Sequence, residues 1–406
     1  GAVLKAAFSG FYDAVDVCVF ILMVGGFLGV VMKTGAIDAG VSNVIARLQG
    51  KESWLIAILM VFFGLGGTTY GMWEETMAFF PLLLPVFLAA GYDAVVGVAV
   101  ILLGAGAGVI ASTVNPFATG IAAGFAGVSL GEGIVLRLLE WVAFEAAAIW
   151  FVMAYAAKVK KNPSKSVVGV GAGKIQVSMD QQVPFTAKRK VIMALFTLTF
   201  LIMVYAVVPF DEMGLSLPAL GWWFPELSAL FLVAGVVIGL IDRMSEEELV
   251  ETYVAGCADL LGVAFIIGIS RGITVLMNDG AITDTVLHWG EQALSGAGAI
   301  SFTLLVFALY LPLTILIPSS SGLATLSIPI VAPLGKFAGV GGDLVVTAFQ
   351  SASGLVNIIT PTAAVVMGAL ALGHVPYDRW VKYVWKLILW FLLLALAFLV
   401  AGVLLG

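Results

Sequence analysis

Residues 112–119 read STVNPFAT, and residues 357–362 read NIITPT. Each run lies midway along an apolar stretch that is too long for one membrane crossing, 93–127 in the first case and 343–373 in the second. Proline lacks the amide hydrogen that would bond backwards along a helix, so each run predicts a helix that stops and starts again. Two broken helices inside apolar stretches indicate an all-α integral membrane protein.

The composition places the whole chain in a lipid bilayer. Hydrophobic residues make up 61% of the 406 residues and charged residues 11%, with a mean hydropathy of +1.11. Soluble domains are about half apolar and about a quarter charged, so that class is excluded. A net charge of −6 offers no basic surface to nucleic acid. Two histidines and two cysteines, far apart in sequence, provide neither a zinc site nor a catalytic set, so we expect no enzyme and no bound cofactor.

Apolar stretches of about 20 residues are needed to cross the hydrocarbon. The expected simple crossings are 12–32, 133–157, 190–209, 226–241, 254–277 and 379–405. Two other regions, 54–90 and 300–340, hold apolar arms around a polar tip, at 66–71 and 318–322 respectively. Each arm is short for a crossing, so we expect helical hairpins that enter and leave on the same side.

The chain contains an internal repeat. Residues 32–38 (MKTGAID) match residues 277–283 (MNDGAIT) at an offset of 245, and the same offset aligns the two proline breaks. Each half runs in the order span, surface helix, hairpin, broken helix, span. We therefore predict one repeat in 1–157 and a second in 190–406, joined by the basic linker 158–189. Spans 190–209 and 226–241 have no partners before residue 12, so an intact first repeat would have one or two further helices there.

Loop charges predict that the two repeats are inverted. The loop 33–53 carries Lys33, Arg47 and Lys51, whereas its mate 278–299 carries three acidic residues and no basic one. Short cytoplasmic loops collect Lys and Arg, so the two loops should face opposite sides. The linker 158–189 is then cytoplasmic and the C-terminus is outside. Hairpin 54–90 opens to the cytoplasm and hairpin 300–340 to the exterior.

Both breaks and both hairpin tips should meet near the middle of the bilayer, as in carriers built from inverted repeats. A broken helix exposes amides that bind carboxylates and carbonyls that bind small cations. The expected substrate-binding residues are Thr68, Thr69, Tyr70, Glu74, Glu75, Ser112, Thr113, Asn115, Thr119, Ser319, Ser320, Ser321, Asn357, Thr360 and Thr362. A sodium ion would bind near Ser112, Asn115, Ser353 and Asn357.

Charged residues inside the spans are few. A carboxylate at membrane depth is costly and marks a substrate, ion or proton path, so we expect one of Glu74 and Glu75 in the site and the other to be structural or solvated. Arg271 is the only basic residue well inside a span, and we expect it to pair within the protein.

Two further pairs of acidic residues are interpreted from their position alone. Asp13 and Asp16 stand at the start of an apolar run, where we expect the membrane surface. Glu140 and Glu145 lie on span 133–157 and have no partner that the sequence identifies.

The order of hairpins and broken helices resembles the ion transporter superfamily of elevator carriers. Residues 67–76 (GTTYGMWEET) and 112–120 (STVNPFATG) resemble the YfcC branch of the anaerobic C4-dicarboxylate carrier family. The resemblance implies a homodimer in which spans hold still while hairpins and broken helices slide across the membrane. Related dicarboxylate/sodium symporters carry Ser-Asn-Thr at their tips, which this chain lacks, so their ligand contacts are not carried over.

The predicted function is secondary active transport of a small carboxylate-bearing metabolite across the cytoplasmic (inner) membrane of a prokaryote. An amino acid, in particular a basic one moved by exchange, would satisfy both the half-helix ends and Glu74 or Glu75. The alternative is a C4-dicarboxylate carrier coupled to Na⁺ or H⁺, since added cations would offset the glutamates. A channel is a remoter alternative. The sequence leaves open whether sodium, protons or exchange drives transport.

Overall fold

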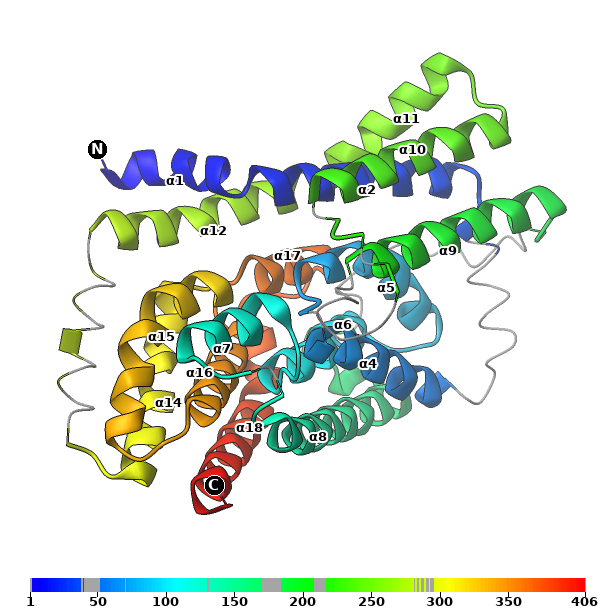
Figure 1. The fold of residues 1–406 in the computed structure, drawn as a ribbon. Coiled ribbons are helices and arrows are strands. Elements are labelled where there is room, and N and C mark those ends of the chain that lie inside the picture. The colour runs from blue at the N-terminus through cyan, green and yellow to red at the C-terminus, as the bar shows by residue number, and fades with distance from the viewer. Residues whose placement is uncertain are drawn as a thin grey trace.

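The structure is a computed structural model that describes residues 2–37, 39, 52–69, 71–129, 131–169, 184–207, 217, 218, 220–222, 224–280 and 296–405, with isolated positions between 281 and 295. Within these residues every regular element is helical, as expected. The helices form two layers (Figure 1). We call the first the cover layer: α1 (Ala2–Asp13), α2 (Val15–Lys33), α9 (Ala187–Val207), α10 (Phe224–Asp242), α11 (Glu246–Asp259) and α12 (Leu261–Asp279).

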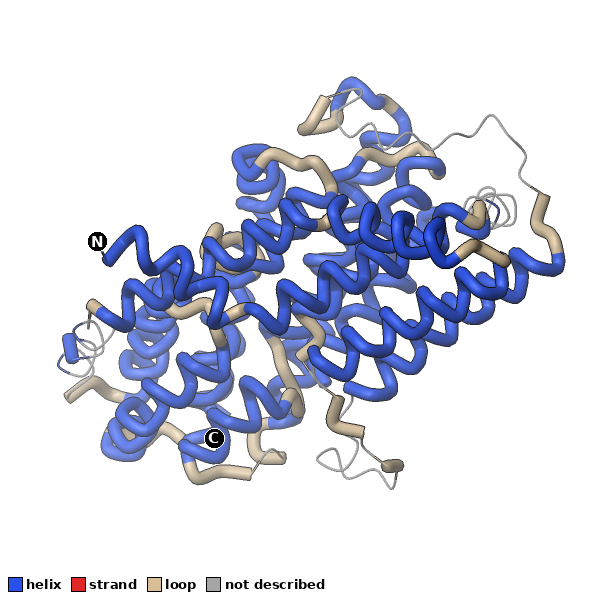
Figure 2. The backbone as a smooth tube through the Cα atoms, turned by 90° about the horizontal axis from the view of Figure 1, so that it is seen from above, coloured by secondary structure: helices blue, strands red, loops and turns tan. Residues whose placement is uncertain are grey.

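The second layer, which we call the hairpin body, holds both hairpins and both broken helices. Its first half comprises α4 (Glu52–Thr69), η1 (Glu74–Phe79), α5 (Phe80–Ala89), α6 (Ala94–Ile110), η2 (Pro116–Gly120), α7 (Ile121–Ala126), α8 (Ile134–Lys161) and the short turn η3 (Pro163–Lys165). Its second half comprises α14 (Ala299–Leu316), α15 (Ser320–Phe337), α16 (Gly342–Asn357), α17 (Ala364–Leu372) and α18 (Tyr377–Leu405). Seen from above, the cover layer lies across this body (Figure 2).

Helix lengths repeat between the two halves. Helices α2 and α12 each have 19 residues, α4 and α14 each have 18, and α8 and α18 have 28 and 29. Both proline runs interrupt a helix: α6 ends at Ile110 and helix resumes at Pro116, while α16 ends at Asn357 and α17 begins at Ala364. Every residue of α6, and every residue of α16 except Asp343, is buried, so these two helices form the centre of the body.

Two expected crossings are not single helices. The stretch 12–32 is bent by 66° between α1 and α2, and 254–277 is divided at Leu260 between α11 and α12. Asp13 and Asp259 are the last residues of α1 and α11, 246 positions apart. Aspartate competes for backbone hydrogen bonds and favours helix ends, which accounts for a break at both places without proline or glycine.

One hairpin arm is longer than expected. Among the described helices, α10, α14 and α18 are long and apolar enough to cross a membrane by length and composition, and the bent pair α1–α2 adds a fourth if taken as one span. The expectation that each hairpin arm is too short is therefore wrong for α14. This helix continues through Pro312 to Leu316, a length of about 27 Å.

Glycines allow the crossed helices of the cover layer to pack closely. Helix α1 packs on α12 and α11 packs on α2, so the helix before the break in each half lies on the helix after the break in the other half. A Cβ on Gly10 would clash with the backbone of Gly272, and a Cβ on Gly256 would clash with the carbonyl of Gly25. Small residues at these crossings let the helix backbones approach each other closely. Such close packing stabilises helix association within a membrane, where there is no hydrophobic driving force between helices.

Substituting Gly256→Ala should therefore weaken the cover layer by about 1–3 kcal/mol, because the added methyl meets backbone that cannot move aside. The matched control is Gly262→Ala on α12, where a Cβ would meet nothing within 4 Å. The apparent melting temperature of the purified protein in detergent should fall for the first variant and not for the second. Equal melting temperatures would show that the crossing does not depend on glycine.

Candidate functional site

A cavity of about 280 Å³ lies where the cover layer meets the two hairpin tips. The hairpin body lines it with Gly71, Trp73, Glu74, Glu75, Val109, Asn115, Pro318, Ser319, Ser320, Ser321 and Asn357. The cover layer adds Asp13, Asp16 and Phe224. Both tips, the first break and the end of α16 thus meet around one space, although they lie far apart in the sequence.

Seven of the expected substrate residues line this cavity: Glu74, Glu75, Asn115, Ser319, Ser320, Ser321 and Asn357. The first tip lies in close contact with Asn115 at Gly71. This glycine has φ +79°, and a Cβ there would clash with the Asn115 amide. Ser319 caps α15 by accepting a hydrogen bond from the Gly322 amide at 3.3 Å. The start of α15 therefore points its amides toward the cavity, an arrangement that favours anionic groups.

Thr68 and Thr113 do not line the cavity and instead join the first hairpin to the first break. The Thr68 hydroxyl donates to the Ala111 carbonyl at 2.8 Å, and the Thr113 hydroxyl donates to the Thr68 carbonyl at 2.9 Å. The Thr113 amide also donates to the Thr68 carbonyl, at 2.9 Å. These hydroxyls are used by the backbone, so a structural role accounts for them.

The second half repeats this connection. Thr360 and Thr362 share a hydrogen bond of 2.8 Å, and the Thr362 hydroxyl donates to the Ile315 carbonyl at 2.9 Å, near the end of α14. One arm of each hairpin, α4 in the first half and α14 in the second, is thus tied to the break of its own half through threonine.

The remaining expected residues are also bonded or lie outside the described part. Thr119 donates to Ser112 at 2.8 Å, and both are fully buried. The Thr69 hydroxyl donates to the Leu65 carbonyl at 2.6 Å, within its own helix. Tyr70 and the side chain of Arg271 lie outside the described residues.

The cavity is acidic. Asp13, Asp16, Glu74 and Glu75 line it, and none of the described lining residues is basic. Both glutamates face it, rather than one as expected. Glu75 is 6% exposed and accepts a hydrogen bond from the Trp73 amide at 3.1 Å, whereas Glu74 is half-buried.

Asp13, Asp16, Trp73 and Phe224 are the functional candidates that the sequence did not identify. Asp13 and Asp16, which we expected at the membrane surface, lie at the bend between α1 and α2 and line the cavity together with the hairpin tips. The sequence contained one signal for Asp13: the second half has an aspartate, Asp259, at the position that corresponds to it.

Three buried oxygens follow one face of α16. Gln350 Oε1, Ser353 Oγ and Asn357 Oδ1 have no hydrogen-bond partner among the described residues. Spacings of three and four residues place them on the same side of the helix. Buried polar atoms of this kind call for a ligand, since a lost partner costs about 1–3 kcal/mol. Ser353 and Asn357 belong to the expected sodium site, and Gln350 is an addition.

Two glutamates on α8 are buried away from the cavity. Glu140 accepts a hydrogen bond from Ser351 at 2.7 Å, which links α8 to α16. Glu145 is 4% exposed, and neither of its carboxylate oxygens has a hydrogen-bond partner among the described residues.

Comparison with known proteins gives the family. The sequence model of the C4-dicarboxylate anaerobic carrier family matches residues 3–404. An uncharacterized protein of Haemophilus influenzae is 37% identical over 407 residues, which cover 99% of this chain and 78% of that protein. An Escherichia coli protein named "Putative basic amino acid antiporter YfcC" is 32% identical over 391 residues, which cover 92% of this chain and 74% of that protein.

Solved structures are more distant. The YdaH transporter of Alcanivorax borkumensis has a TM-score of 0.46 at 15% identity, over 98% of this chain and 87% of that chain. MtrF of Neisseria gonorrhoeae, from a study of antimetabolite efflux pumps, has a TM-score of 0.47 at 18% identity. The match covers 98% of this chain and 83% of that chain. The family assignment rests on the sequence matches. They confirm the family resemblance described above, and they confirm that the protein is a transporter rather than an enzyme. The chain therefore belongs to the C4-dicarboxylate anaerobic carrier family of multi-pass membrane transporters.

Proposed function

We propose that this carrier exchanges basic amino acids. The observation that supports this substrate is the charge of the cavity, with four carboxylates and no basic side chain among its described lining residues. A basic amino acid carries two cationic groups and one carboxylate at neutral pH. Its cationic groups would lie near Asp13, Asp16, Glu74 and Glu75, and its carboxylate near the serines at the start of α15.

Electrostatics disfavours a dicarboxylate in the same place. Two like charges 4 Å apart repel by about 4 kcal/mol at an effective dielectric constant near 20. A dicarboxylate would add two such charges to four, so it needs several compensating protons or cations. A basic amino acid instead reduces the net charge of the cavity. The name of the Escherichia coli relative, which assigns basic amino acids to that protein, agrees with this choice.

The transport movement that we propose is an elevator. The cavity takes its walls from both layers, with Asp13, Asp16 and Phe224 on the cover layer and the remaining lining residues on the hairpin body. A sliding of the body along the cover layer would carry the bound substrate across the membrane and separate it from Asp13 and Asp16. The carrier would work as a homodimer in the cytoplasmic membrane, with the linker 158–189 in the cytoplasm.

Neutralising Glu75 should impair exchange. Loss of one charge-assisted contact, worth about 1.5–3 kcal/mol, should raise KM for a basic amino acid roughly 10- to 100-fold in Glu75→Gln. Asp16→Asn should act in the same direction from the cover layer. The measurement is uptake of labelled arginine into proteoliposomes loaded with unlabelled arginine, with succinate tested in parallel.

Glu247→Gln is the matched control, because this exposed glutamate lies on α11 outside the cavity. It should leave KM unchanged. The proposal fails if Glu75→Gln and Asp16→Asn both transport arginine like the parent protein, or if the parent protein transports succinate and not arginine.

A second candidate, a sodium-coupled C4-dicarboxylate carrier, is favoured by the three unpartnered oxygens of α16 and by the description of the family. Gln350, Ser353 and Asn357 would coordinate the ion through side-chain oxygens, the ligand type that hard cations prefer. The ion would then offset part of the charge of a dicarboxylate in the adjoining cavity.

Sodium binding can be measured without transport. If the ion binds at α16, NaCl should raise the apparent melting temperature of the parent protein above its value in choline chloride, and Ser353→Ala should abolish that difference. Ser228→Ala is the control, since this buried serine donates to Phe224 within α10 and should keep the sodium effect. A parent protein that melts equally in both salts would exclude this second candidate.

A further inference from the structure

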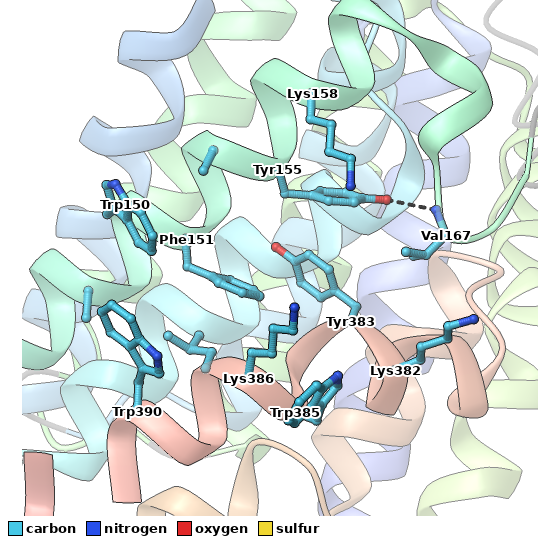
Figure 3. Close-up of a pocket in the computed structure, with 13 residues that line it drawn as sticks. Trp150, Phe151, Tyr155, Lys158, Val167, Lys382, Tyr383, Trp385, Lys386 and Trp390 are labelled. Carbon is cyan, nitrogen blue, oxygen red and sulfur yellow. Dashed lines mark hydrogen bonds between the residues drawn. The ribbon is translucent and has the colours of Figure 1, made fainter. Parts of the chain in front are cut away.

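A second pocket, of about 400 Å³, lies between α8 and α18 on the outside of the hairpin body (Figure 3). It shares no lining residue with the acidic cavity. Its walls combine three lysines with a group of aromatic side chains, namely Trp150, Phe151, Tyr155, Tyr383, Trp385 and Trp390. Neither the proposed exchange nor the packing of the two helices accounts for this combination.

The charge of this pocket is positive. Lys158 lies in the last turn of α8, and Lys382 and Lys386 lie one turn apart near the start of α18. None of the described lining residues is acidic. The nearby carboxylate of Asp93 already accepts hydrogen bonds from Tyr155 and Ser166, both at 2.6 Å. The three ammonium groups are therefore suited to a ligand with negative charge.

The opposite end of the pocket is apolar. Trp150 and Trp390 stack with ring centroids 5.6 Å apart and an interplanar angle of 15°. Both are more than half exposed, at 59% and 53%. Eight residues separate Trp150 from Lys158 and Trp390 from Lys382, so each helix places its tryptophan about 12 Å from its lysine. Since α8 and α18 run antiparallel here, with Trp150 beside Trp390 and Tyr155 beside Tyr383, the pocket has one cationic end and one aromatic end.

We propose that this pocket binds an anionic phospholipid of the cytoplasmic leaflet. Its phosphate would lie among Lys158, Lys382 and Lys386, and an acyl chain would run along Trp150 and Trp390. Tyr383 also lines the pocket; it is 6% exposed, and its buried hydroxyl has no hydrogen-bond partner among the described residues. Basic pockets between membrane helices on the cytoplasmic side recognise anionic headgroups in this way, and tryptophan lies at the headgroup level.

A second copy of the chain fits this surface less well. Lysine is depleted at the centres of protein interfaces. A two-fold contact across the pocket would place three lysines of one protomer opposite the same three of its partner. The proposal depends on the membrane family and on the cytoplasmic position of the linker, and it does not depend on the substrate.

The experiment compares how different lipids bind to the purified protein in detergent. Native mass spectrometry should detect retained phosphatidylglycerol, and added phosphatidylglycerol should raise the apparent melting temperature more than phosphatidylcholine or inorganic phosphate does. Combined Lys158→Gln, Lys382→Gln and Lys386→Gln should weaken phosphatidylglycerol binding about 100-fold, taking about 1 kcal/mol for each lysine. Lys386→Gln alone should weaken phosphatidylglycerol binding by a smaller factor. This single variant tests the proposal if the triple variant does not fold.

Lys160→Gln, Lys161→Gln and Lys165→Gln together form the matched control, because these exposed lysines lie at the same end of α8 but outside the pocket. The control should bind phosphatidylglycerol like the parent protein. The proposal is overturned if the control loses the lipid as fully as the pocket variant, or if inorganic phosphate stabilises the protein as well as the lipid does. It is also overturned if Trp390→Cys forms a disulfide between two protomers in the membrane, because a second copy would then cover the pocket.

Discussion

A helix that breaks inside a membrane leaves backbone amides and carbonyls that lipid cannot bond, and the arrangement of this carrier follows from how those groups are satisfied. In the first half, Thr68 and Thr113 exchange hydrogen bonds between hairpin and break. In the second half, Thr362 donates to the carbonyl of Ile315. Each break is therefore held against the hairpin of its own repeat. The polar tips must then lie beside the breaks, which creates an irregular polar region at the centre of an apolar body.

The cover layer determines the charge of that region. Glycine crossings let α1 lie on α12 and α11 lie on α2, so the helices on both sides of the bend at Ala14 pack against helices of the second repeat. The bend brings Asp13 and Asp16 opposite Glu74 and Glu75. Charges shared between two layers are suited to a carrier, because a cationic substrate would hold the layers together only while it is bound.

Local chemistry made the breaks and tips predictable. Asn115-Pro116 and Thr360-Pro361 interrupt apolar stretches with residues that end helices, and their equal spacing from the surrounding anchors shows the repeat. Other features depend on tertiary contacts. The bend at Ala14 contains no proline or glycine, so nothing local places Asp13 and Asp16 in a cavity. Thr68 and Thr113 look like ligands in the sequence because their carbonyl partners are contributed by another segment, and Gln350 becomes notable only once its oxygen is seen to be buried and unpartnered.

We infer that the two halves lie inverted in the bilayer, and labelling of single cysteines tests this most directly. Lys33 and Asp279 are exposed, end the corresponding helices α2 and α12, and can each be replaced by cysteine after Cys18→Ser and Cys257→Ser. A membrane-impermeant maleimide should label Lys33→Cys only in inside-out vesicles and Asp279→Cys only in right-side-out vesicles. Labelling of both positions from the same face would contradict the inversion and, with it, the convergence of two opposed repeats on one transport site.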